Sequence, residues 1–190
     1  FTTLGALDLA IYRIDPAQMQ QGRPTHLAGV LGMRDPSRER WPLEGSDRLQ
    51  RVGRRSLPIT GREAEGIFTM RLDLPKQKPG VYVVAVENEE LQRIAVLNVT
   101  DLALVCKWAP QALLAYAVDI RTGAPRAGVH ISATAGAGPL AEGVTGSDGL
   151  LALAVADAPE YGRVAVTARA GDAVATVETW TYGARAVTAT

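Results

Sequence analysis

Residues 99–153 read VTDLALVCKWAPQALLAYAVDIRTGAPRAGVHISATAGAGPLAEGVTGSDGLLAL, a series of short apolar runs separated by turn residues. The segment DIRTGAPRAG, residues 119–128, places two glycines and a proline between two alternating runs, as in a chain that reverses between strands. The segment TGSDGL, residues 145–150, contains Asp-Gly, which accepts the positive φ angles that a tight hairpin needs. Turns at this spacing between runs rich in valine, alanine and leucine are typical of an antiparallel β-sandwich.

The sequence on both sides of this stretch continues the all-β pattern. Toward the C-terminus, Gly171-Asp172 forms a two-residue turn between apolar runs, so residues 100–190 hold six or seven strands. Toward the N-terminus, residues 17–62 are richer in charge, proline and glycine, which indicates loops and short edge pieces around a buried Trp41. The strands expected in this half are residues 4–14, 66–75, 81–87 and 91–100, the last two as a hairpin.

The length of 190 residues suits two domains, because one sandwich of this kind takes about 90–100 residues. We therefore predict two tandem immunoglobulin-like antiparallel β-sandwiches, one over residues 1–99 and one over residues 100–190. The chain begins at Phe1 without a charged start and a long apolar region, so no signal peptide is expected. That beginning leads us to expect a fragment of a larger protein.

The composition excludes several classes of function. Twenty basic and twenty acidic residues balance, so the surface as a whole has no bias toward nucleic acid or anionic lipid. Cys106 is the only cysteine, which excludes an internal disulfide and a cysteine-rich metal site. No apolar run approaches the roughly 20 residues that cross a bilayer. We expect no cofactor, no nucleic-acid partner, and membrane attachment only through an anchor outside this segment.

Reactive side chains are few and scattered. Cys106 ends an apolar run and is read as an inward-facing structural residue, because free cysteine is among the most buried residue types. His130 and Ser132 lie two residues apart on one strand face, but the sequence suggests no orienting group or oxyanion site for them. His26 lies in sequence without regular alternation, and the pattern suggests no residue that would pair with it. We therefore predict no catalytic residues.

The charged residues also indicate structure rather than chemistry. Asp148 lacks the companion carboxylates of a calcium loop, and Asp101, Asp119 and Asp157 are read as turn or capping groups. A section rich in arginine is the one candidate binding surface, and interleaved acids favour a solvated, internally paired loop. Its arginines are Arg34, Arg38, Arg40, Arg48, Arg51, Arg54 and Arg55. We predict no metal site.

The order of these motifs resembles that in bacterial alpha-2-macroglobulins. In that family a Thr-Asp-hydrophobic opening, here residues 100–105, begins a macroglobulin-like domain. A D-x-x-T-G-x-P-x-x-G-V turn and a T-x-x-D-G turn follow, here residues 119–129 and 145–149. LDLAIYRID at residues 7–15 resembles the opening strand of the preceding domain, and LPKQKPGVYVVAVE at residues 74–87 resembles its closing hairpin.

The resemblance implies two seven-stranded macroglobulin-like domains from the N-terminal half of a large bacterial protease trap. Such proteins are broad-spectrum endopeptidase inhibitors of the periplasm, some of them anchored to the inner membrane as lipoproteins, or are secreted. In many members a Cys-Glu-x-Gln thioester captures the protease, but Cys106 is followed by Lys-Trp-Ala. The implied role is a non-catalytic framework segment, whose partners are the other domains of the parent chain and, through the whole protein, the target proteases.

Two other functions are open at this stage. The chain could serve as an immunoglobulin-like spacer or ligand-binding module of a bacterial surface adhesin or carbohydrate-active enzyme. An enzymatic role, with Cys106 or the pair Ser132 and His130 as a hydrolytic centre, ranks last because no third group completes either arrangement.

Overall fold

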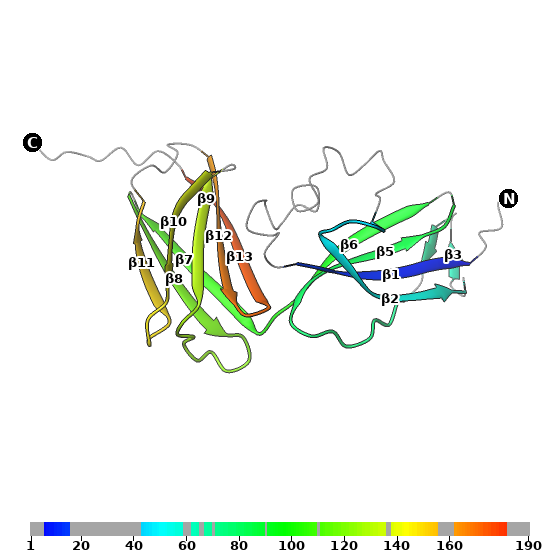
Figure 1. The fold of residues 1–190 in the computed structure, drawn as a ribbon, viewed down its shortest axis with the longest axis horizontal. Helices are drawn as coiled ribbons and strands as arrows, with labels where there is room; N and C mark the ends of the chain where they lie inside the picture. The colour runs from blue at the N-terminus through cyan, green and yellow to red at the C-terminus, as the bar shows by residue number, and fades with distance from the viewer. Residues whose placement is uncertain are drawn as a thin grey trace, which may run out of the picture.

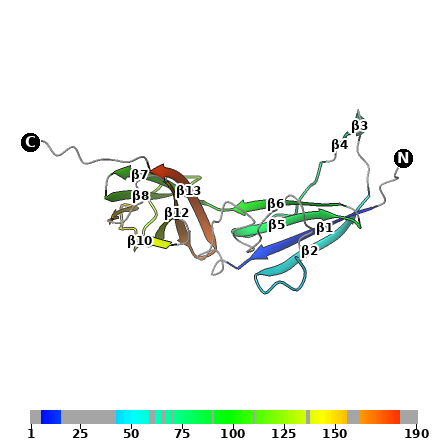
Figure 2. The same cartoon turned by 90° about the horizontal axis from the view of Figure 1, so that it is seen from above.

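The computed structural model describes residues 6–15, 43–58, 62–64, 67–69, 71–89, 91–109, 111–135, 138–155 and 162–181. These residues form thirteen strands and no helix, which confirms the predicted all-β class. Every strand pair is antiparallel. Figures 1 and 2 show two groups of sheets placed end to end along the long axis, the N-terminal half (residues 6–99) and the C-terminal half (residues 100–181).

The N-terminal half is built on one four-stranded sheet in the order β2-β1-β5-β6, and a separate pair of short strands, β3 and β4. β5 and β6 form the predicted hairpin. The sheet has apolar clusters on both faces, because its two central strands, β1 and β5, are buried on both sides. The strands are β1 (Leu7–Ile14), β2 (Leu49–Leu57), β3 (Arg62–Ala64), β4 (Ile67–Thr69), β5 (Gly80–Glu87) and β6 (Gln92–Val99).

The C-terminal half is a sandwich of seven strands. A four-stranded sheet in the order β10-β9-β12-β13 packs on a three-stranded sheet in the order β11-β8-β7, and one apolar cluster lies between them. β12 and β13 form a hairpin with the predicted two-residue turn at Gly171-Asp172. The strands are β7 (Leu102–Ala109), β8 (Ala112–Asp119), β9 (His130–Ala135), β10 (Gly138–Val144), β11 (Leu150–Ala154), β12 (Gly162–Ala170) and β13 (Ala173–Thr181).

The section predicted to be loops and short edge pieces contains a strand of nine residues, β2, which pairs along its length with β1. Its sequence, LQRVGRRSL, exposes most of its side chains. An edge strand of this kind carries little apolar alternation, because only the leucines at its two ends, Leu49 and Leu57, pack against the apolar clusters. Backbone pairing to β1 therefore decides its conformation, and a pattern search misses it.

The sequence suggested hairpins at the two turns that decide the fold, residues 119–128 and 145–150. Neither turn is a hairpin in the structure. β8 lies in the three-stranded sheet and β9 in the four-stranded one, so residues 120–129 carry the chain across the core. β10 and β11 also belong to different sheets, so the Asp-Gly turn crosses back. We call a connection that crosses from one sheet to the other an arch. Residues with positive φ angles occur in arches as well as in hairpins, so the local sequence does not distinguish the two.

Two strand boundaries differ from the predicted ones. β7 continues through Trp108 and Ala109, where a turn was predicted, and the reversal falls at Gln111, which has a φ of 61°. The strand expected over residues 66–75 is the short β4, and residues 71–78 lie outside any strand.

Candidate functional site

The tip of the β12–β13 hairpin packs against the N-terminal half. Alternation along β13 directs Ala173 and Ala175 into the core of their own sandwich and Val174 to the opposite side. Val174 is only 2% exposed, and it belongs to the cluster that contains Tyr12 of β1 and Val81 of β5. A side chain of the C-terminal half therefore completes an apolar core of the N-terminal half.

Arg13 adds a polar contact at the same place. Its guanidinium forms an ion pair of 2.8 Å with the carboxylate of Asp172, in the hairpin turn. It also donates a hydrogen bond of 3.2 Å to the carbonyl of Pro79, just before β5. Arg13 thus connects the hairpin turn of one half to the first and fifth strands of the other.

The Pro-Gly-Val-Tyr motif shapes the surface that receives Arg13. Gly80 has a φ of 148°, and a Cβ at that position would lie 3.2 Å from Nε of Arg13. Tyr82 donates a hydrogen bond of 2.8 Å to the carbonyl of Lys78 and so fixes the entry into β5. Glycine is needed here because it has the freedom to adopt this φ and leaves room for the arginine.

The connection between the halves is short and hydrogen-bonded. The side-chain amide of Asn98, near the end of β6, donates to the carbonyl of Val174 at 3.0 Å. Thr100 follows, and its hydroxyl accepts a hydrogen bond of 3.1 Å from the backbone N–H of Leu102 at the start of β7. The chain therefore enters the second sandwich while it is fixed to that sandwich's last hairpin.

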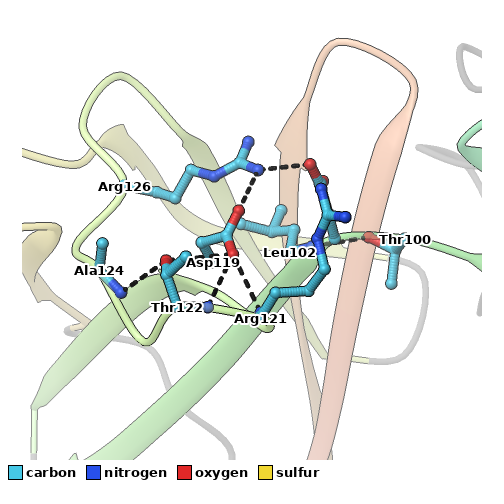
Figure 3. Close-up of polar contacts among 8 residues, drawn as sticks. Thr100, Leu102, Asp119, Arg121, Thr122, Ala124 and Arg126 are labelled. Carbon is cyan, nitrogen blue, oxygen red and sulfur yellow. Dashed lines mark hydrogen bonds and ion pairs between the residues drawn. The ribbon is translucent and has the colours of Figure 1, made fainter.

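Arg126 holds the beginning of β7 to the end of β8 (Figure 3). Its guanidinium contacts the carboxylate of Asp101 at 2.5 Å and that of Asp119 at 3.0 Å. Asp119 also accepts hydrogen bonds from the backbone N–H groups of Arg121 and Thr122. The Thr-Asp opening and the turn motif at residues 119–128 thus form one network, which the sequence analysis treated as separate capping groups.

The pKa of Asp119 falls from its usual 3.8 to about 2, chiefly because Arg126 hydrogen-bonds the carboxylate, with help from the N–H of Thr122. A lowered pKa means that the ionised form stabilises the fold above pH 3.8. This contribution is lost progressively as the pH falls through the folded-state value near 2.

We therefore expect the Asp119 carboxyl to titrate near pH 2 in the folded chain, measured from its side-chain carbon chemical shift by NMR. In Asp119→Asn, the fall in unfolding free energy between pH 4 and pH 2 should be smaller than in the unchanged chain. A titration midpoint near 3.8 would show that Arg126 does not hold this carboxylate.

Buried hydrogen bonds also link the two arches. Thr145 is buried, and its hydroxyl donates to the carbonyl of Arg126 at 2.7 Å and accepts from the N–H of Val129 at 3.0 Å. The carboxylate of Asp148 accepts from the N–H of Leu150 at 3.0 Å. The motif residues of the arch at 145–150 are therefore structural in the described fold.

Cys106 lies in β7 and packs, partly buried, against the core of the second sandwich. Burial raises the pKa of its thiol from 9.0 to about 11. The thiolate is the reactive form, so this environment suppresses nucleophilic chemistry.

Alkylation of Cys106 by iodoacetamide at pH 8 should be about 100-fold slower in the folded chain than after unfolding in urea, because two pKa units remove most of the thiolate. Mass spectrometry of quenched samples measures both rates. Equal rates would place the thiol at an open, unshifted site.

His130 and Ser132 lie on the outer face of the four-stranded sheet, as alternation predicts. Glu142, which lies opposite Ser132 on β10, has its carboxylate 3.8 Å from the His130 imidazole; the Glu142 side chain is exposed and the His130 side chain is partly exposed. The described structure shows no hydrogen bond between Ser132 and His130, and the absence of catalytic residues stays a prediction.

The arginine-rich section is described from residue 43 onward. Arg54 pairs with Asp8 at 2.8 Å, Arg51 pairs with Glu44, and Arg55 donates to the carbonyl of Asp73 at 2.5 Å. Of these three contacts only Arg51–Glu44 lies within the section, while Arg54 and Arg55 contact residues outside it, so internal pairing of the whole section stays a prediction. Outside the described residues lie His26, Arg34, Arg38, Arg40, Trp41 and Asp157.

The described residues offer neither a metal cluster nor a membrane-spanning helix. No group of three or more His, Cys, Asp or Glu side chains there is arranged to hold a metal ion. None of these residues belongs to a helix that is long and apolar enough to cross a membrane.

Comparison with known proteins gives a structural match but no match in sequence. No family model matches the chain, and no curated protein matches it. A crystal structure of native alpha-2-macroglobulin from Escherichia coli spanning domains MG0-NIE-MG1 matches with a TM-score of 0.62 and 13% identity. The match covers 93% of this chain and 55% of that one, so the chain spans little more than half of that structure.

A second crystal structure of the same Escherichia coli protein, spanning domains NIE-MG1, has a TM-score of 0.59 and 16% identity. This match covers 93% of this chain and 84% of the other. At these identities the likeness establishes the fold. The all-β macroglobulin-like fold that the motifs predict is confirmed. The predicted seven strands are present in the C-terminal half, whereas the described part of the N-terminal half has six, in one four-stranded sheet and one separate pair.

Sequence reasoning missed the residues that join the two halves. Asn98 and Val174 lie outside the quoted motifs and Arg13 lies inside one, but each belongs to a strand whose pattern is explained without the contact. The available signals were slight: a single arginine in an otherwise apolar strand end, and a valine on the solvent side of an edge strand.

Proposed function

We propose that this chain is a non-catalytic framework segment of a bacterial alpha-2-macroglobulin-like protease inhibitor. The observation that carries the proposal is the match across 93% of the chain to a two-domain piece of native Escherichia coli alpha-2-macroglobulin. The match spans both halves in order, so it concerns their arrangement as well as each β-fold. The ordered motifs, which lie at the contact and in the arches, support the same family.

The proposal places two macroglobulin-like domains at residues 1–99 and 100–190. The apolar clusters support this division: one draws only on residues 102–177, while the other two draw on residues 7–97 with Val174 as the sole addition. In this role the chain fixes the geometry between neighbouring domains. The residues that fix this geometry at the contact are Arg13, Asn98 and Val174. Arg126 stabilises the entry to the second domain.

The proposed partners and location are those of the parent protein. Its partners are the other domains of that protein and, through the whole assembly, target proteases in the periplasm or outside the cell. The raised pKa of the Cys106 thiol supports a role without catalysis.

The test is to purify the full-length parent protein and the 190-residue chain and to assay both against trypsin and elastase on a large protein substrate. The parent is expected to inhibit and the chain alone to have no effect on either protease. Inhibition by the isolated chain, hydrolysis by it, or a parent built of repeated immunoglobulin units with a wall anchor would overturn the proposal. The last outcome favours the adhesin alternative.

A further inference from the structure

The outer face of the three-stranded sheet β11-β8-β7 is apolar, which is unusual for a sheet face in contact with water. The alternate positions of β7 and β8 face the core, so Val105, Leu114 and Leu150 lie outward, with exposed fractions of 59%, 40% and 38%. Tyr116 lies between Val105 and Leu150 in register. The other outward positions of the three strands are alanine or valine, with one exception, Lys107.

The opposite side of the same sandwich provides a comparison. The four-stranded sheet turns His130, Ser132, Arg169 and Thr176 outward, and this polar composition is normal for a solvated face. The outer face of the four-stranded sheet thus carries several polar side chains beside Val144 and Val174, whereas the outer face of the three-stranded sheet is almost entirely apolar. The largest apolar patch of a domain is often an interaction site.

Charge limits what can cover the apolar face. Lys107 is its only charged residue, and among the described residues none forms an ion pair with it. In a symmetric dimer the same patch meets itself, so two ammonium groups would enter one apolar contact without a counter-charge, at a high desolvation cost. A surface that is apolar and offers one carboxylate to Lys107 offsets part of this cost with a counter-charge.

Area limits the occupant further. Strands about 4.8 Å apart with a rise of about 3.3 Å per residue give the face roughly 300–400 Å², about half of the ~800 Å² that each partner of a stable bimolecular complex buries. A contact of this size is weak between separate molecules. It is adequate between domains of one polypeptide, because the tether supplies a high effective concentration.

We propose that the outer face of β11-β8-β7 docks a further domain of the same polypeptide, through an apolar surface with a carboxylate placed opposite Lys107. The inference rests on the proposed function, since it requires a parent protein with additional domains. It adds a second interdomain surface, on a different part of the second sandwich from the contact with Val174.

The test uses the full-length parent treated with a carbodiimide, which joins an amine to a carboxylate only when the two are in contact. Lys107 is expected to form an amide with an Asp or Glu outside residues 1–190 of the same polypeptide, identified by mass spectrometry of the monomer. Lys107→Arg keeps the charge and should abolish this cross-link. Lys78, in the exposed segment before β5, reports general reactivity.

A second variant separates docking from folding. Val105→Arg adds a second cation to the apolar face and should lower the Lys107 cross-link about tenfold, because the new charge must lose its hydration on docking. In the 190-residue chain alone the same variant should leave the thermal midpoint unchanged, since Val105 is exposed.

The outcomes separate the two proposals. A Lys107 cross-link to a second copy, or none at all while Lys78 reacts, overturns this inference and leaves the proposed function standing. An unchanged Lys107 cross-link in Val105→Arg also overturns it. A parent that contains no further folded domain overturns the proposed function and this inference together.

Discussion

Gly149→Ala is expected to lower the unfolding free energy of the C-terminal sandwich by about 3–5 kcal/mol, as measured by urea denaturation. Gly149 has a φ of 74°, a conformation that costs an alanine about 1–2 kcal/mol. The larger part of the effect comes from space. A Cβ there would lie 2.7 Å from the carbonyl oxygen of Ala117 and 3.1 Å from the backbone nitrogen of Arg126.

The atoms around Gly149 cannot move away cheaply. The N–H of Ala117 donates to the carbonyl of Gly149 at 2.9 Å, and the N–H of Arg126 donates to the carbonyl of Ala117 at 2.8 Å. These two hydrogen bonds join both arches to the central strand β8. Any shift that relieves the added methyl group must break at least one of them.

Gly123→Ala is the matched control. Gly123 has nearly the same φ, 70°, but a Cβ at this position would have no other atom within 4 Å. It should therefore show only the conformational cost of about 1–2 kcal/mol. Equal losses in the two variants would mean that the two arches are not packed against β8 as described.

Val174→Asp is expected to detach the hairpin tip from the N-terminal half. A carboxylate at this position would be buried in an apolar cluster beside Tyr12 and Val81, at a cost of several kcal/mol, about 3–5. The second sandwich should stay folded, because Val174 does not contribute to its core. Amide hydrogen exchange at the start of β5 and in β1 should accelerate, and small-angle scattering should report a larger radius of gyration.

Two controls frame this result. Val174→Ala removes two methyl-sized groups and should cost about 1.6 kcal/mol without detachment. Val144→Asp places the same charge on an exposed valine of the same four-stranded sheet and should change stability by less than about 0.5 kcal/mol. Unchanged hydrogen exchange in Val174→Asp would contradict the contact between the halves.

Local chemistry explains what the sequence could predict. The Gly171-Asp172 turn and the β5–β6 hairpin follow from short-range turn preferences and alternation, and both are in the structure. The Asp-Gly and Gly-Ala-Pro turns were located correctly, but their partners were not. Whether a turn joins neighbouring strands or crosses between sheets depends on which strands pair, and that is decided by burial across the whole sandwich.

The contact between the halves could not be predicted for a related reason. Val174 reads as the exposed member of an alternating strand, and Arg13 reads as one polar residue in an apolar one. The role of each residue depends on contact with the other half. β2 shows the same limit, because its conformation comes from pairing with β1 rather than from its own residues.

A framework role requires that the two halves keep one relative arrangement, and Val174 tests this most directly. In the 190-residue chain with ¹³C-labelled methyl groups, nuclear Overhauser contacts are expected from the methyls of Val174 to side chains of its cluster in the N-terminal half, which includes Tyr12 and Val81. These contacts should weaken in Val174→Ala. A folded chain in which β13 is formed but Val174 makes no such contact with the other half would contradict the account.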